Sequence, residues 1–95
     1  MKFVLTGRIR QKLKDKHGVI PEEVEQCFYN RAGCFLEDAR EEHRTHPPTQ
    51  WFIAETDAGR RLKVVFVEDV DAGVIHIKTA YEPNATEEKI YGKHG

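Results

Sequence analysis

The side chains best suited to chemistry lie on two segments that are typical of neighbouring strands, and they are Lys63, His76, Lys78 and Tyr81. Side chains alternate between the two faces of a strand, so His76 and Lys78 share one face while the isoleucines beside them share the other. Lys63 joins the polar face if the hairpin register is regular. Tyr81 joins it only if the strand carries a bulge near Thr79. The pattern predicts a sheet with one polar and one apolar face.

These are the residue types that RNA cleavage without a metal ion needs. Cations offset the charge that builds up on the pentavalent phosphate, and a histidine or tyrosine moves protons at the 2′-hydroxyl and the 5′-oxygen. We expect His76 or Tyr81 to transfer the proton. The expected phosphate contacts are Arg61, Lys63 and Lys78. The alternative interpretation is an ordinary solvated sheet face, because a strand face that carries lysines is common.

Two neighbouring aromatic residues bear on the same face. Trp51 and Phe52 point to opposite sides of their expected strand, so one of them is predicted to be the more exposed. Both are interpreted first as core residues. An exposed aromatic ring beside Lys63 would offer a surface on which a base stacks.

The histidines and cysteines do not form a pattern typical of metal sites. His43 and His46 lie three residues apart in a polar segment, residues 37–49, that is expected to be an exposed loop. Cys27 and Cys34 form no CxxC pair. A metal ion needs more ligands on a fixed frame. We therefore predict that the protein binds no metal ion and no cofactor.

Capping residues, turn residues and apolar spacing predict the elements that position these side chains. The first half of the chain is expected to contain a short strand at 3–5, a helix capped by Thr6 that runs to about Lys16, a helix from Pro21 that ends before Gly33, and a brief strand at 34–36. Three strands are expected next, at 50–56, 60–67 and 74–81, joined by turns at 57–59 and 71–73. The last expected element is a helix that is capped by Asn84 and runs to about Tyr91.

This order predicts an α+β domain that spans residues 1–95. Two N-terminal helices are expected to pack on one face of a three- to four-stranded antiparallel sheet, followed by a short C-terminal helix. The helical stripes and the strand alternation predict the members of the core, which are Ile9, Leu13, Val24, Phe28, Val64, Phe66, Ile75 and Ile77.

Length and charge limit the classes of function. The chain has 95 residues, of which 39% are hydrophobic and 33% charged, and these values are typical of one small globular domain. A formal net charge of -1 excludes nucleic-acid binding by bulk charge, so any such site must be local. No apolar run approaches the roughly 20 residues that span a bilayer, and the N-terminal apolar run is too short for a signal peptide. A cytoplasmic location without membrane contact is expected.

Several short motifs resemble those of a known family. Lys16-His17-Gly18-Val19, followed by Glu22-Glu23 and Phe28, resembles the opening of BrnT-type ribonuclease toxins. Leu62-Lys63-Val64-Val65-Phe66, followed by Ile75-His76-Ile77-Lys78-Thr79-Ala80, resembles the paired strands of the same toxins. The resemblance covers nearly the whole chain.

The C-terminal part of the chain adds two further points of resemblance. Tyr91 matches a tyrosine in the last helix of the toxins, whereas Tyr81 stands where their strand ends in an arginine. The segment Thr79-Ala80-Tyr81-Glu82-Pro83-Asn84 is similar to that of a small domain family with the same outline. Chains of that family are sometimes labelled ADP-ribosyl-(dinitrogen reductase) hydrolase.

The resemblance implies a RelE-like fold in which two N-terminal helices cover one sheet face and the other face meets RNA. It implies a toxin of a bacterial toxin–antitoxin system, with metal-independent endoribonuclease activity and a DNA-binding antitoxin as its protein partner. One alternative is a non-catalytic module of the same fold that binds RNA or a protein. The other is the ADP-ribosyl hydrolase activity, which in the enzymes of that name depends on a two-metal carboxylate site in a much larger protein.

Overall fold

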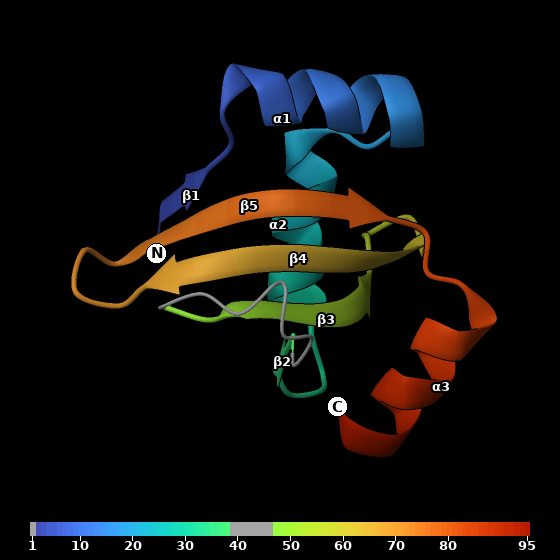
Figure 1. Cartoon of the computed structure of the whole chain (residues 1–95). Coiled ribbons are helices and arrows are strands. Elements are labelled where there is room, and N and C mark those ends of the chain that lie inside the picture. Colours follow the sequence, from blue (N-terminus) through green and yellow to red (C-terminus); the bar gives the residue numbers. More distant parts are fainter. Residues whose placement is uncertain (1, 39–46) are drawn as a thin grey trace.

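The computed structural model describes residues 2–38 and 47–95, which form an α+β domain (Figure 1). The expected elements are present with small shifts in their bounds. The helical segments are α1 (Gly7–Lys12), η1 (Leu13–His17), α2 (Pro21–Asn30) and α3 (Ala85–His94). The strands are β1 (Lys2–Val4), β2 (Leu36–Glu37), β3 (Thr49–Glu55), β4 (Arg61–Asp69) and β5 (Val74–Tyr81). His43 and His46 lie outside the described residues.

Within the described part of the chain, the sheet has five strands in the order β1-β5-β4-β3-β2. Strands β2 to β5 are antiparallel to their neighbours, but β1 runs parallel to β5, with Lys2 opposite Val74. The expected three- to four-stranded antiparallel sheet is therefore corrected to a five-stranded mixed one. The short apolar run at residues 3–5 indicates a strand, but the partner of that strand depends on where the following helix packs.

One face of the sheet is apolar and carries the core. Phe52 and Val64 are paired across β3 and β4 on this face, and both are fully buried. Helix α2 passes behind the sheet in Figure 1 and places Phe28 against Phe52 and Phe66, with ring centroids 4.7 and 5.2 Å apart. Six of the expected core residues are buried, and Ile9 and Phe28 pack against them while partly exposed. The expected core is confirmed in its centre.

The two N-terminal helical segments do not lie side by side on this face. Helix α2 contacts β3 and β4, whereas α1 and η1 contact β5 at the margin of the sheet (Figure 1). Gly18 adopts a left-handed conformation, with φ 60°, and turns the chain from η1 toward α2. We expected both helices to cover one face of the sheet. Helix α2 does so, whereas α1 and η1 lie against β5.

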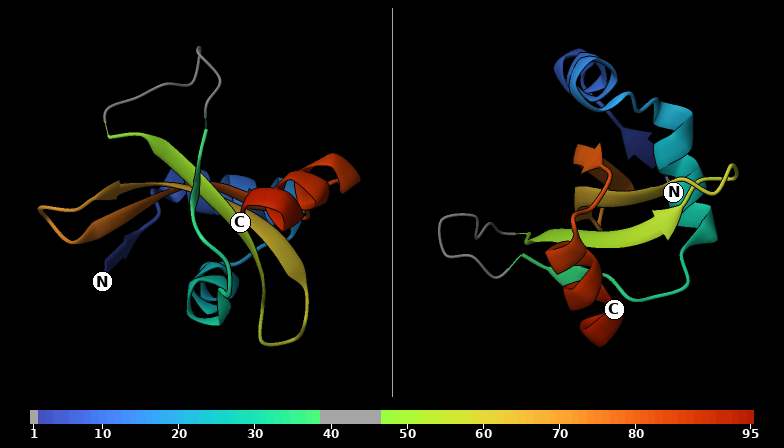
Figure 2. Two further views of the ribbon diagram at one scale, coloured as in Figure 1. Left: turned by 90° about the horizontal axis from the view of Figure 1, so that it is seen from below. Right: turned by 90° about the vertical axis from the view of Figure 1, so that its right-hand side faces the viewer.

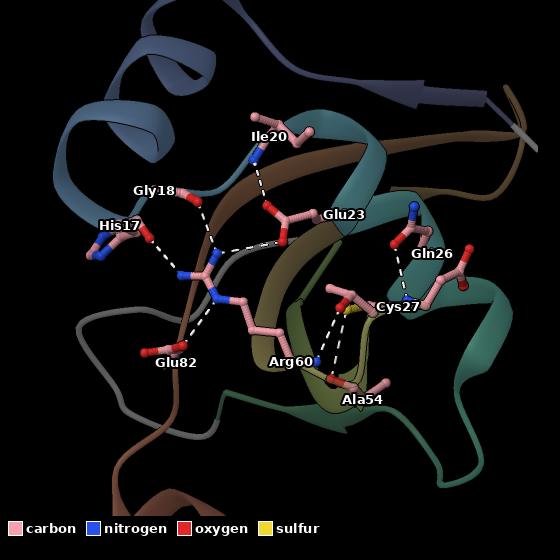
Figure 3. Close-up of polar contacts among 11 residues, drawn as sticks. His17, Gly18, Ile20, Glu23, Gln26, Cys27, Ala54, Arg60 and Glu82 are labelled. Atoms are coloured by element: carbon pink, nitrogen blue, oxygen red, sulfur yellow. Dashed lines mark hydrogen bonds and ion pairs between the residues drawn. The ribbon is translucent and has the colours of Figure 1, made fainter.

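Arg60 holds this turn and the hairpin between β3 and β4 together (Figure 3). Its guanidinium donates hydrogen bonds of 2.8 Å to the carbonyl oxygens of His17 and Gly18. The same group forms ion pairs with Glu23 on α2, at 3.4 Å, and with Glu82 after β5, at 3.0 Å. The segment around His17 and Gly18 therefore has a structural role, because its carbonyl oxygens accept hydrogen bonds from Arg60, which lies where four chain segments meet.

Helix α3 lies on the other side of the sheet from α2 (Figure 2). Asn84 and Glu87 form the expected capping box, with the Asn84 side chain accepting from the Glu87 amide at 2.8 Å. The helix runs through Gly92 to His94 and does not stop near Tyr91, because Gly92 does not take the left-handed conformation that ends a helix. Among residues 2–38 and 47–95, no helix has the length and apolar character needed to cross a membrane.

Candidate functional site

The sheet surface opposite α2 is called the open face below. It carries three rows of side chains that run across the strands, and each row takes one residue from each of β3, β4 and β5. Strand pairing places the rows as Ile53–Lys63–Tyr81, Trp51–Val65–Thr79 and Thr49–Val67–His76. Helix α3 covers part of the first row and the Trp51 end of the second, since Glu87 contacts Lys63 and the Tyr91 ring lies 5.7 Å from that of Trp51. The second and third rows each line a pocket.

An irregularity in β5 brings Tyr81 to the open face. Val65 pairs with Thr79, whereas the next residue of β4, Phe66, pairs with Ile77, so the register shifts at Lys78. The extra residue reverses the alternation after Ile77, as a β-bulge does. Tyr81 therefore lies beside Lys63 on the polar side, although it is three residues from Lys78 in the sequence.

The middle of the open face contains a pocket of about 310 Å³, lined by Asp38, Thr49, Trp51, Lys63, Val65, Lys78, Thr79 and Tyr81. It is bounded by the Trp51 indole, and the Lys63 ammonium lies 4.5 Å from the centroid of that ring. The pocket thus combines an aromatic surface, two lysines and a phenol hydroxyl. Three of the predicted site residues, Lys63, Lys78 and Tyr81, meet here.

Lys63 and Tyr81 share one carboxylate from α3. Glu87 Oε2 accepts a hydrogen bond from Lys63 Nζ at 2.7 Å and another from the Tyr81 hydroxyl at 2.6 Å. Burial raises the pKa of Glu87, but the hydrogen bonds from Lys63 and Tyr81 outweigh it, so that the net pKa lies below the ordinary value. Glu87 is therefore an anion at neutral pH.

The same contacts fix the protonation state of Tyr81. Burial raises its pKa, and the hydrogen bond to Glu87 raises it further, whereas the Lys63 ammonium lowers it. The pKa of Tyr81 remains above its ordinary value. At neutral pH the hydroxyl keeps its proton and acts as a donor.

Arg61 is also held by α3. Its Nε and Nη2 atoms each donate a 2.8 Å hydrogen bond to the carboxylate of Glu88, and Nη1 lies 3.6 Å from Glu55. Hydrogen bonding to Arg61 places the pKa of Glu88 below its ordinary value. Two of the three expected phosphate contacts, Arg61 and Lys63, are therefore neutralised by adjacent residues of one helix.

Lys78 differs from these two cations. It is exposed on β5, and within residues 2–38 and 47–95 it has no ion-pair partner. Its side chain borders the same pocket as Trp51 and Tyr81. Of the three predicted phosphate contacts, Lys78 is the one without an ion pair in the described part of the chain.

His76 lies apart from the other predicted residues. It pairs with Val67, four residues along β4 from Lys63, which corresponds to about 13 Å at the rise of an antiparallel strand. It borders a separate pocket of about 400 Å³ with Pro47 and an acidic turn that includes Asp69. The expected patch that unites His76 with Lys63 and Lys78 is therefore corrected, because His76 lies near the turn between β4 and β5 whereas Lys63 lies toward the other end of β4.

Two groups near Tyr81 escaped the sequence interpretation. His17, which the sequence indicated only as part of the Lys16-His17-Gly18-Val19 motif, lies with its ring 5.6 Å from that of Tyr81. Glu87 belongs to the capping box of α3, and the sequence does not mark it as a partner of the sheet. The capping box signals where a helix starts, and nothing in it indicates the surface on which the helix will lie.

A pH-dependent contribution to stability follows from the lowered pKa of Glu87. Glu87→Gln keeps a side-chain oxygen for the capping bond but removes the charge that faces Lys63, and we expect it to destabilise the protein by about 1–3 kcal/mol at pH 7. A carboxylate with a lowered folded-state pKa stabilises above its unfolded pKa and loses that contribution as the pH falls. The difference between wild type and variant should thus be constant above about pH 5 and shrink below the ordinary value of 4.5.

Urea denaturation of both proteins between pH 3 and 8 measures this difference. Lys78→Gln is the control for general charge effects, since Lys78 lacks a carboxylate partner among the described residues. A difference between wild type and Glu87→Gln that stays the same at low pH would contradict the assignment.

The described residues do not form a metal site. Within residues 2–38 and 47–95, no three or more His, Cys, Asp or Glu side chains lie together so that they could hold a metal ion. Cys27 is buried, and burial raises the pKa of its thiol to about 12, so that it remains protonated. That the protein binds no metal ion stays a prediction.

Comparisons of the sequence with protein-family models and with curated proteins found no match. The functional argument therefore depends on the open face itself, where an indole, two lysines and a tyrosine hydroxyl surround one pocket.

Proposed function

We propose that the protein binds single-stranded RNA on the open face of its sheet and cleaves it without a metal ion. The observation that carries the proposal is the pocket of about 310 Å³ in which Trp51, Lys63, Lys78 and Tyr81 converge. An aromatic ring beside cations suits single-stranded RNA, whose unpaired bases stack on aromatic side chains while its phosphates contact lysine and arginine. The small net charge of the chain requires a local site of this kind.

In the proposed complex a base stacks on Trp51 and the adjoining phosphate contacts Lys78. Lys63 lies over the Trp51 ring and 5.7 Å from the centroid of the Tyr81 ring, so it reaches the same phosphate from the other side of the pocket. Arg61 contacts the next phosphate toward α3. The three cations offset the charge of the transition state.

Cleavage proceeds by attack of the 2′-oxygen on phosphorus and rupture of the bond to the 5′-oxygen. Tyr81, which holds its proton at neutral pH, protonates the departing 5′-oxygen and then regains a proton from water. The 2′-hydroxyl proton leaves to solvent. The products are a 2′,3′-cyclic phosphate and a free 5′-hydroxyl, and His76 has no part in this mechanism because it lies in the other pocket.

We further propose that the protein is a RelE- and BrnT-like toxin whose protein partner is an antitoxin. The support is the resemblance of residues 16–28 and 62–80, together with the α+β fold that it implies. Co-expression with the product of an adjacent reading frame tests this part. Growth arrest by the chain alone, relieved by the neighbour, would support it.

A non-catalytic module that binds RNA or a protein is the second candidate. One observation favours it: Glu87 and Glu88 already neutralise Lys63 and Arg61. Tyr81 alone can donate a proton but cannot also accept one from the 2′-hydroxyl. The hydrolase alternative has no comparable support, since the described residues contain no carboxylate group suited to a metal pair.

The fluorescence of Trp51 tests binding directly, because it is the only tryptophan of the chain. Short single-stranded RNA is expected to quench it. Lys78→Gln should weaken binding and reduce the slope of log K against log salt by about 0.7, the value for one lost phosphate contact on a single strand. The control is Lys14→Gln, which removes the same charge from the exposed surface of η1.

Equal losses of affinity and of salt slope in both variants would place the RNA elsewhere. The same mixtures, incubated with a chelator and analysed by mass spectrometry, report on cleavage. Binding without a 2′,3′-cyclic phosphate product would favour the second candidate.

A further inference from the structure

We infer that α3 shields the RNA site in the free protein: the carboxylates of Glu87 and Glu88 occupy the places of two RNA phosphates on Lys63 and Arg61, and RNA must displace them. This inference deepens the proposed function and depends on it. It concerns how the site is regulated.

The contact between Glu88 and Arg61 has the geometry of a guanidinium bound to a phosphate. Two parallel hydrogen bonds of 2.8 Å join Nε and Nη2 to the two carboxylate oxygens. A phosphate presents two oxygens to the same two donors, and such paired contacts are the strongest that arginine makes. Glu88 and a phosphate therefore compete for one position.

Glu87 occupies a second position, immediately beside the first. A single oxygen of its carboxylate accepts from both Lys63, at 2.7 Å, and Tyr81, at 2.6 Å. These are the cation and the proton donor that the proposed cleavage uses. While Glu87 remains there, Tyr81 cannot reach a 5′-oxygen.

The attachment of α3 to the sheet is limited. Of its ten residues only Tyr91 is buried, where its hydroxyl donates a 2.8 Å hydrogen bond to the carbonyl of Cys34. Ile90, which a firmly packed helix would bury, is 43% exposed. Apart from Tyr91, the helix is held mainly by the carboxylates of Glu87 and Glu88. An anion that competes for Lys63 and Arg61 therefore weakens the attachment of the helix to the sheet.

The geometry also gives an order of events. Lys78, at the border of the Trp51 pocket, is exposed while α3 is in place, so RNA can bind there first. A neighbouring phosphate is then held close to Lys63 and competes with Glu87 at a high local concentration. A single nucleotide can fill the pocket, but only a longer strand reaches past it to displace α3.

The test compares two doubly substituted proteins of equal net charge. Glu87→Gln with Glu88→Gln removes the competing charges, whereas Glu22→Gln with Glu25→Gln removes two exposed charges from α2, at the other face of the sheet. We expect the first variant to bind single-stranded RNA roughly tenfold more tightly than wild type, and the control to stay within about twofold. Glu88→Gln alone leaves Lys63 paired and should give a smaller gain in RNA affinity. This single variant replaces the double variant in the test if the double variant is unstable.

Hydrogen exchange gives a second measurement on the wild-type protein. Saturating RNA is expected to increase the exchange of the amides of residues 85–94, and a mononucleotide that binds the pocket is expected not to. Wild type that binds RNA with the same affinity as the first variant, or RNA that slows exchange in α3, would overturn the inference. Failure of wild type and of the charge-removed variants alike to bind RNA would overturn the proposed function as well.

Discussion

Replacing Phe66 by alanine is expected to lower the free energy of unfolding by about 3–5 kcal/mol. Phe66 is fully buried in the centre of β4. Its ring lies 4.8 Å from Phe35, 5.2 Å from Phe28 and 6.0 Å from Phe52, measured between centroids. These rings come from different elements, so the cavity left by truncation cannot be closed by a single side-chain movement. A loss of this size approaches the whole stability of a small domain.

Urea denaturation followed by far-ultraviolet circular dichroism measures the change. Val70→Ala is the control, since Val70 is 76% exposed at the turn after β4 and its truncation should change the unfolding free energy by less than about 0.5 kcal/mol. A loss below about 1 kcal/mol for Phe66→Ala would mean that the aromatic cluster is not the centre of the core.

Tyr81→Phe is expected to slow RNA cleavage by roughly 10²–10⁴-fold, the usual cost of removing a group that transfers a proton in the transition state. The substitution keeps the ring, and with it the contacts to His17 and Lys63, but removes the hydroxyl that the raised pKa keeps protonated. RNA affinity should change little. The measurement is the single-turnover rate of cleavage at saturating protein.

His76→Ala is the matched control on the same strand. Because His76 borders the separate pocket near Asp69, its loss should leave the cleavage rate within about twofold. A rate that falls with His76 and not with Tyr81 would reverse the assignment of the proton donor. A protein that cleaves RNA only after His76 or Tyr81 is replaced by arginine would contradict the proposed mechanism.

Local signals in the sequence predicted the elements well. The Thr6 hydroxyl accepts from the Ile9 amide at 3.2 Å and begins the first helix as expected, and Gly18 ends it in a left-handed conformation. Asn84 and Glu87 cap α3 in the same way. Such signals depend on residues three or four apart, so a single sequence contains them in full.

Arrangements that depend on distant segments were not predictable in this way. The register shift at Lys78 was foreseen only as a condition for Tyr81, and it places Tyr81 opposite Lys63 on the open face. The position of α3 on the open face depends on Tyr91 reaching the carbonyl of Cys34, 57 residues earlier. Glu87 became a site residue for that reason alone.

The margins of the sheet limit how a partner protein can approach it. At one edge β1 has three residues, and at the other β2 has two. Beyond β2, the side chain of Asn30 donates a hydrogen bond of 3.0 Å to the carbonyl oxygen of Glu55 in β3. An added strand needs a long row of unpaired backbone groups, and the described edge strands β1 and β2 are too short to present one. We therefore expect a protein partner of this domain to recognise side chains on a face or a helix and not to extend the sheet.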